Sequence, residues 1–173
     1  MDKDYKILEE VIYCGIGQGE SLLHFGACNS GDTILKVLDE YELDVEYTAV
    51  DVDDKIKTFF TDFEPNERNY PWVSVQESMQ EFIDNVQEER YNWTLITGIF
   101  DKPKFKERQY QFIDTVLKDC MRFSDNVIFT VEIKPFEDFK YNVGFLLLHG
   151  FSKFKKVTIK KIEEDTYIFC INN

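Results

Sequence analysis

The sequence predicts an α/β fold, a three-layer sandwich in which helices cover both faces of a mostly parallel, seven-stranded sheet. Three observations predict it. Short apolar runs alternate with segments whose apolar residues recur at helical spacing, which indicates parallel strands joined by helical crossovers. Residues 126–133 are almost wholly apolar, as in a strand buried on both faces. Residues 155–162 and 166–171 are separated by only three polar residues, which predicts an antiparallel hairpin at the C-terminal end.

The first elements are expected before residue 61. The amphipathic segment 5–13 predicts a helix that ends near a group of glycines, and 21–25 predicts a short apolar strand. Apolar residues recur at helical spacing in 33–41, so this segment predicts a helix. Residues 45–52 predict the second strand, and 54–60 predict a short helix.

The middle of the chain continues this alternation after an irregular connection over 61–71. Residues 72–75 predict a third strand, and 78–86 predict a helix with its apolar residues on one side. Residues 93–97 predict the fourth strand, and 107–123 predict the longest helix of the chain. The apolar fifth strand follows this helix directly.

The last part of the chain closes the fold. A helix over 141–150, stopped by Gly150, is expected to lead into the hairpin, which reverses one strand of the sheet. No linker, repeat or low-complexity tract divides the sequence. We therefore expect a single domain over 1–173, in which 1–20 form an N-terminal helix and a glycine-containing connection.

Composition and charge exclude several classes of function. The formal net charge of −13 argues against a nucleic-acid partner, because such proteins usually carry a basic face. The basic segment 153–161 alternates like a strand with one lysine-bearing solvent face. No apolar run reaches the roughly 20 residues of a membrane span, and the start lacks a secretory-signal layout. The four cysteines are scattered without CxxC spacing, so we expect a cytoplasmic protein with reduced thiols and no metal site.

Two glycine-containing loops compete for a ligand role. Ligands of open parallel sheets bind beyond the carboxyl ends of the strands, where the strand order reverses. The segment "GIGQGE", residues 15–20, precedes the first strand and so belongs to the opposite edge. The segment "HFGACNSGD", residues 24–32, follows that strand. Gly26 would let the backbone approach a ligand closely, and we expect leucine at this position to block binding.

An acid stands at the end of the second strand. Asp51 comes 25 residues after Gly26, within "AVDVD", and directly follows the apolar pair Ala49-Val50. A carboxylate at this place can accept hydrogen bonds from both ribose hydroxyls of a nucleoside. Asp53 is the weaker candidate, because it falls in the first turn of the next expected helix.

With these residues in place, the chain resembles class I S-adenosylmethionine-dependent methyltransferases from about Ser21 to Ile171. The stretches that carry the resemblance are "LLHFGACNSGD", "AVDVD", "WVSVQES", "YNWTLITGIF" and "LLLHGFSKF" with the hairpin after it. The hairpin discriminates best, because nicotinamide-binding folds more often end with a further strand and helix. The resemblance implies S-adenosylmethionine as cofactor and methyl transfer to a small-molecule or protein acceptor. From the charge and the hydropathy we expect no nucleic-acid and no membrane partner.

The resemblance also implies roles for residues at the first two strand ends. The backbone of Gly26, Ala27 and Cys28 would contact the methionine end of the cofactor. Asp51 would hold the ribose, and Val52 would lie against the adenine. His24 stands where the family usually has an acid, and it either bonds the methionine end or is a polar residue satisfied inside the sheet.

Further roles fall on the next two strand ends. Glu77 or Ser78 would meet the adenine amino group, and Thr97, Gly98 and Phe100 would line the methyl-transfer side. The candidates for a catalytic base are Asp101 and Glu132, each of which has a solvated surface carboxylate as its alternative interpretation.

The departures from the family leave other interpretations open. Cys28 and Ser30 stand where the family has further glycines, so a catalytically inactive binding or interaction module is the main alternative. "TGIFDKP" replaces the Asn-Pro-Pro-aromatic stretch of enzymes that methylate nucleic-acid bases. A dehydrogenase is disfavoured by the absence of G-x-G-x-x-G. A thiol or metal site of His24, Cys28 and His149 lacks ligand spacing.

Overall fold

A six-stranded mixed sheet forms the centre of the computed structural model, which describes residues 3–27, 31–52, 79–86, 90–100, 109–132, 156–163 and 166–172. Its strand order is β2-β1-β3-β4-β6-β5. The first four of these strands pair in parallel, and β6 runs antiparallel to both of its neighbours. The strands are β1 (Ser21–Phe25), β2 (Glu46–Val50), β3 (Tyr91–Ile96), β4 (Ser124–Glu132), β5 (Lys156–Lys161) and β6 (Thr166–Asn172).

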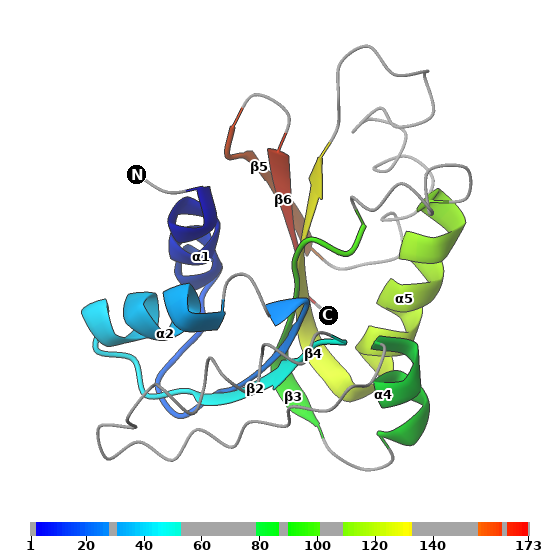
Figure 1. Ribbon diagram of the computed structural model, residues 1–173, viewed down its shortest axis with the longest axis horizontal. Helices are drawn as coiled ribbons and strands as arrows, with labels where there is room; N and C mark the ends of the chain where they lie inside the picture. Colours follow the sequence, from blue (N-terminus) through cyan, green and yellow to red (C-terminus); the bar gives the residue numbers. More distant parts are fainter. Residues whose placement is uncertain are drawn as a thin grey trace.

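Helices cover both faces of the sheet (Figure 1). One face carries α1 (Lys3–Tyr13) and α2 (Gly31–Glu40), and the other carries α4 (Met79–Asn85) and α5 (Gln109–Phe123). The buried apolar side chains divide into two clusters accordingly, because successive residues of a strand point to opposite faces. On β1, Leu22 belongs to the α1–α2 cluster and Leu23 to the α4–α5 cluster.

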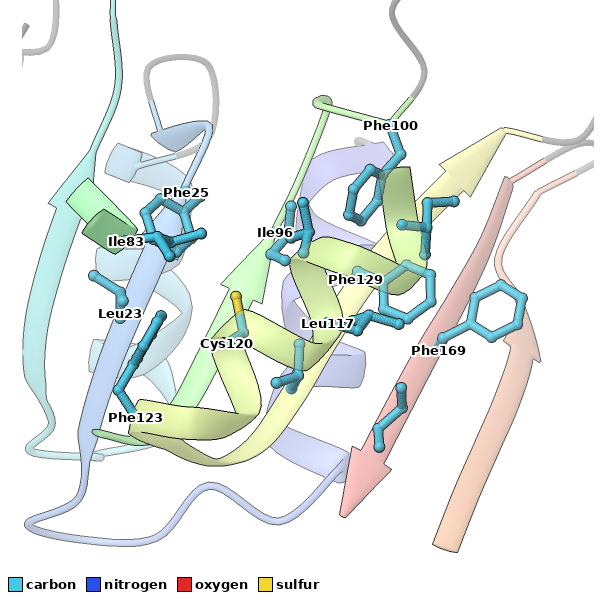
Figure 2. Close-up of a cluster of buried hydrophobic side chains, with 14 of the residues drawn as sticks. Leu23, Phe25, Ile83, Ile96, Phe100, Leu117, Cys120, Phe123, Phe129 and Phe169 are labelled. Atoms are coloured by element: carbon cyan, nitrogen blue, oxygen red, sulfur yellow. The ribbon is translucent and has the colours of Figure 1, made fainter. Parts of the chain in front are cut away.

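Most of the buried aromatic side chains of the described residues gather on the α4–α5 side. Figure 2 shows α5 lying over this cluster, with Cys120 and Leu117 of the helix facing the sheet. Phe129 of β4 and Phe169 of β6 stack with ring centroids 4.8 Å apart. Burying such rings removes 150–250 Å² each from water, so this cluster stabilises the fold strongly.

Helix α1 is tied to strands that lie far along the chain. Its buried face is formed by Ile7, Leu8 and Val11. Its polar residues make ion pairs with β4, with β5 and with the turn after β5. These pairs are Lys3–Glu132, Lys6–Glu163 and Lys160–Glu10.

The glycine segment 15–20 lies at the amino edge of the sheet, just before β1. The Gly17 N–H donates to Glu20 Oε2 over 2.7 Å, and the Trp93 Nε1–H donates to the same oxygen over 2.6 Å. This connection is therefore a hydrogen-bonded part of the scaffold.

Most of the predicted elements are confirmed. The α/β layering and the closing hairpin are present, and each described strand agrees with its predicted bounds to within two residues. Lys156, Lys160 and Lys161 of β5 are exposed, as expected for a lysine-bearing solvent face. The expected strand over 72–75 and the expected helices over 54–60 and 141–150 fall outside the described residues, so the seventh strand stays a prediction. None of the described helices is long and apolar enough to cross a membrane.

Candidate functional site

The strand order reverses beside β1. The chain passes from β1 to β2 on one side of it and later reaches β3 on its other side. In open α/β sheets, ligands bind at such a reversal, beyond the carboxyl ends of the strands. Phe25 and Ile96 are register partners at these ends, so residues 25–27 and 96–98 form what we call the switch point. The predicted loop after β1 lies at this place.

Gly26 brings the two strand ends into close contact. Its φ is +80°, in the left-handed region that favours glycine. A Cβ at this position would lie 2.1 Å from the carbonyl oxygen of Thr97. The Gly26 N–H donates to Val50 O over 3.0 Å, and the Thr97 N–H donates to Phe25 O over 3.1 Å. Glycine is therefore required here by the protein's own packing, whatever a ligand adds.

His24 is fully buried and has two protein partners. Its Nδ1 lies 2.8 Å from the hydroxyl of Tyr47 on β2, and its Nε2 lies 2.8 Å from Oγ1 of Thr97. Burial lowers the pKa of His24 to about 3, so the ring is neutral at physiological pH. This is the arrangement of a polar residue satisfied inside the sheet, with both ring nitrogens engaged by the protein.

The depressed pKa of His24 makes stability depend on pH. In the unfolded chain the imidazole takes up a proton below about pH 6.5, whereas in the folded protein it does so only near its pKa of about 3. Above pH 6.5 the imidazole is neutral in both the folded and the unfolded state, so His24 costs no stability there. As the pH drops below that value, the free energy of unfolding falls by about 1.4 kcal/mol per pH unit. Urea unfolding between pH 5 and pH 7 measures this slope.

Two histidine variants identify the group responsible. We expect His24→Gln to remove this part of the slope above pH 5, where most carboxylates remain ionised. His149→Gln is the matched control and should keep it. An unchanged slope in His24→Gln would show that another group titrates.

Asp51 and Val52 follow β2 directly and lie beside the switch point. Asp51 is half-buried, and its neighbour Val50 accepts the hydrogen bond from Gly26. Val52 is 55% exposed, and Tyr13 is the only other exposed large apolar residue in the described ranges. An acid next to an exposed apolar side chain can hold both a hydroxylated ring and a flat aromatic one.

The residues after β3 separate into two groups. Thr97 reaches the switch point, and Gly98 has a φ of +63° with no atom within 4 Å of the Cβ it lacks. Phe100 is fully buried, and its ring meets the ring of Phe129 edge-on at 5.5 Å (Figure 2). Its side chain thus belongs to the core, where the sequence had placed it along the methyl-transfer side.

Ala27 and Glu132 are also described. Ala27 is buried in the α1–α2 cluster. Glu132 comes three residues after Phe129, the register partner of Ile96, and its carboxylate pairs with Lys3. The other predicted site residues lie outside the described part of the chain, so their roles stay predictions. They are Cys28, Glu77, Ser78 and Asp101.

Tyr47 and its bond to His24 were not predicted from the sequence. A signal exists in retrospect, because a histidine within an apolar strand needs buried partners, and tyrosines and threonines of neighbouring strands are the available ones.

The described residues contain no group of three or more His, Cys, Asp or Glu that could hold a metal ion. For the alternative metal site, His24 has both nitrogens occupied, while Cys28 and His149 lie outside those residues.

No protein-family model and no curated protein matches the sequence. Solved structures do match the fold. TrmK of M. capricolum in complex with S-adenosyl-homocysteine has a TM-score of 0.62 and 13% identity, covering 99% of this chain and 68% of that one. Human methyltransferase-like protein 13 in complex with SAH has a TM-score of 0.61 and 14% identity, covering 98% and 78%. The bifunctional kinase-methyltransferase WbdD has a TM-score of 0.65 and 9% identity, covering 99% and 38%. This chain has the fold of these methyltransferases and spans much less than half of WbdD.

Proposed function

We propose that this protein binds S-adenosylmethionine at the switch point and transfers its methyl group to a small-molecule or protein acceptor. The observation that carries the proposal is the meeting of three features at the reversal of the sheet. These are the glycine turn at Gly26, the Asp51–Val52 pair and the Thr97–Gly98 strand end. Two of the structural neighbours are complexes with S-adenosyl-homocysteine, which supports the same ligand class.

The residues present fit such a ligand part by part. The half-buried carboxylate of Asp51 can accept from two ribose hydroxyls, and the exposed side chain of Val52 offers an apolar surface to the adenine. The backbone of Gly26 and Ala27, with Cys28 after them, would hold the methionine end. Glu77 or Ser78 would meet the adenine amino group.

Methyl transfer requires mainly that the protein position the cofactor and the acceptor relative to each other. The bound cofactor supplies a methyl group on a sulfonium, which is already a good leaving group. The protein must then hold the acceptor about 3–3.5 Å from that methyl group and in line with it. Thr97 and Gly98 would line this side. A general base is needed only for an acceptor that starts protonated, and Asp101 and Glu132 are the candidates for it.

The charge of the chain bears on the acceptor. A formal net charge of −13 repels polyanions, so we propose that the acceptor is a small molecule or a protein and not a nucleic acid. The same charge would favour a basic acceptor through long-range steering at low salt.

Thermal unfolding with and without ligands tests the proposal. We expect S-adenosylmethionine and S-adenosyl-homocysteine to raise the unfolding midpoint by several degrees at about 100 times their dissociation constants, where binding adds about 2.7 kcal/mol. NAD at the same concentration should leave the midpoint unchanged. No shift with either adenosyl compound would refute the proposal. A shift with no methyl transfer to any acceptor class would instead indicate a binding module.

A further inference from the structure

Four residues form one hydrogen-bonded chain that ends at the switch point. The hydroxyl of Tyr47 lies 2.8 Å from His24 Nδ1, and His24 Nε2 lies 2.8 Å from Thr97 Oγ1. Thr97 Oγ1 in turn donates to the carbonyl oxygen of Gly26 over 3.3 Å. The chain thus runs from β2 through β1 to the end of β3 and returns to the turn after β1. We call these four residues the polar chain.

The directions of these bonds follow from counting hydrogens. A threonine hydroxyl has one hydrogen, and that of Thr97 goes to the Gly26 carbonyl. The imidazole tautomer with its hydrogen on Nε2 satisfies this arrangement, because Nε2–H then donates to Thr97 Oγ1. A neutral imidazole has one donor and one acceptor, so Nδ1 accepts from the hydroxyl of Tyr47. With this tautomer, every bond of the polar chain points toward Gly26.

We propose that His24 is a positioning residue that acts through Thr97 on the turn at Gly26. The peptide groups of this turn are held from two sides. The Gly26 N–H is bonded to Val50 O on β2, and the Gly26 carbonyl is bonded to Thr97 at the end of β3. His24 fixes the rotamer of Thr97 and so the plane of that carbonyl, without touching the ligand itself.

This inference rests on the proposed function, because the turn matters for binding only if it holds the methionine end of the cofactor. Its physical basis is preorganisation. A turn held in one orientation before binding loses less conformational freedom when the ligand arrives, and affinity rises accordingly. The buried imidazole is explained by its bonds to two hydroxyls, which an apolar residue at position 24 could not make.

Calorimetric titration with S-adenosyl-homocysteine on single and double variants tests the inference. We expect Thr97→Val and His24→Leu each to weaken binding about tenfold, as the loss of one such hydrogen bond implies. The double variant should bind no more weakly than the weaker single variant, because both changes break the same chain. Thr97→Ser keeps the hydroxyl and should restore affinity.

A second buried hydroxyl pair in the same sheet provides the matched control. Thr94 of β3 bonds Ser124 of β4, and neither residue belongs to the polar chain. Thr94→Val should lower the unfolding midpoint and leave the affinity for S-adenosyl-homocysteine unchanged. A purely structural role for the polar chain would instead make Thr97→Val and Thr94→Val behave alike.

The outcomes separate this inference from the proposed function. A natural protein that does not bind S-adenosyl-homocysteine refutes both. If the unsubstituted protein binds S-adenosyl-homocysteine and both Thr97→Val and His24→Leu bind it equally well, only the positioning role is refuted. Effects of the two substitutions that multiply in the double variant also refute it. If His24→Leu does not fold, the comparison of Thr97→Val, Thr97→Ser and Thr94→Val still decides.

Discussion

Replacing Gly26 with alanine is expected to destabilise the protein by about 2–5 kcal/mol. The added Cβ would lie 2.1 Å from the carbonyl oxygen of Thr97 and 3.3 Å from the side chain of Ile99, so the two strand ends must move apart. A left-handed φ of +80° adds strain of about 1–2 kcal/mol for any residue with a Cβ. Urea unfolding followed by circular dichroism measures the change.

Gly98→Ala is the matched control for this substitution. Gly98 also has a left-handed φ, of +63°, but no atom lies within 4 Å of its missing Cβ. We expect the free energy of unfolding of this variant to fall by only about 1–2 kcal/mol, the cost of a left-handed φ for a residue with a Cβ. Equal stabilities of the two alanine variants would mean that the ends of β1 and β3 are not in close contact. A leucine at position 26 would meet the same carbonyl oxygen. Loss of ligand binding in Gly26→Leu would therefore follow from a displaced turn as readily as from a filled ligand site.

Replacing Asp51 with alanine is expected to weaken the binding of S-adenosyl-homocysteine about 100-fold and to leave the fold intact. Hydrogen bonds to a charged group contribute about 1.5–3 kcal/mol each, and we expect two of them from the ribose. A loss of about 3 kcal/mol corresponds to about 100-fold in the dissociation constant. Titration calorimetry measures the affinity, and circular dichroism checks the fold.

Two further variants sharpen the assignment of Asp51. Asp44→Ala removes an exposed acid before β2, at the opposite end of the same strand, and should leave affinity unchanged. Asp51→Asn keeps one acceptor oxygen without the charge and should fall between the natural protein and Asp51→Ala. Full affinity in Asp51→Ala would overturn the assignment of the ribose site.

The order of layers could be predicted because it depends on local periodicity. The apolar run of β4 and the three-residue connection between β5 and β6 are visible in neighbouring letters of the sequence, and both elements are confirmed. The position of the loop after β1 beside the strand-order reversal followed as well, since the end of β1 is fixed once the strand order is known, while its ligand role stays a prediction.

The contacts inside the site could not be predicted in the same way. His24 is separated by 23 residues from Tyr47 and by 73 residues from Thr97, so their pairing depends on the register of three strands. Phe100 was expected along the site because it follows β3 closely. The left-handed φ of Gly98 redirects the backbone after β3, and the ring of Phe100 then packs on β4.

The ion pairs of α1 can form only late in the synthesis of the chain. Its ion-pair partners on β4, on β5 and after β5 lie 129 to 157 residues further along the chain. At about 5–20 residues per second, they leave the ribosome roughly 6 to 30 seconds after the helix does. During that interval the face of Ile7, Leu8 and Val11 has α2 beside it but lacks the strands that finish its burial. The helix is therefore held by its ion pairs only after β4, β5 and the turn after β5 have left the ribosome.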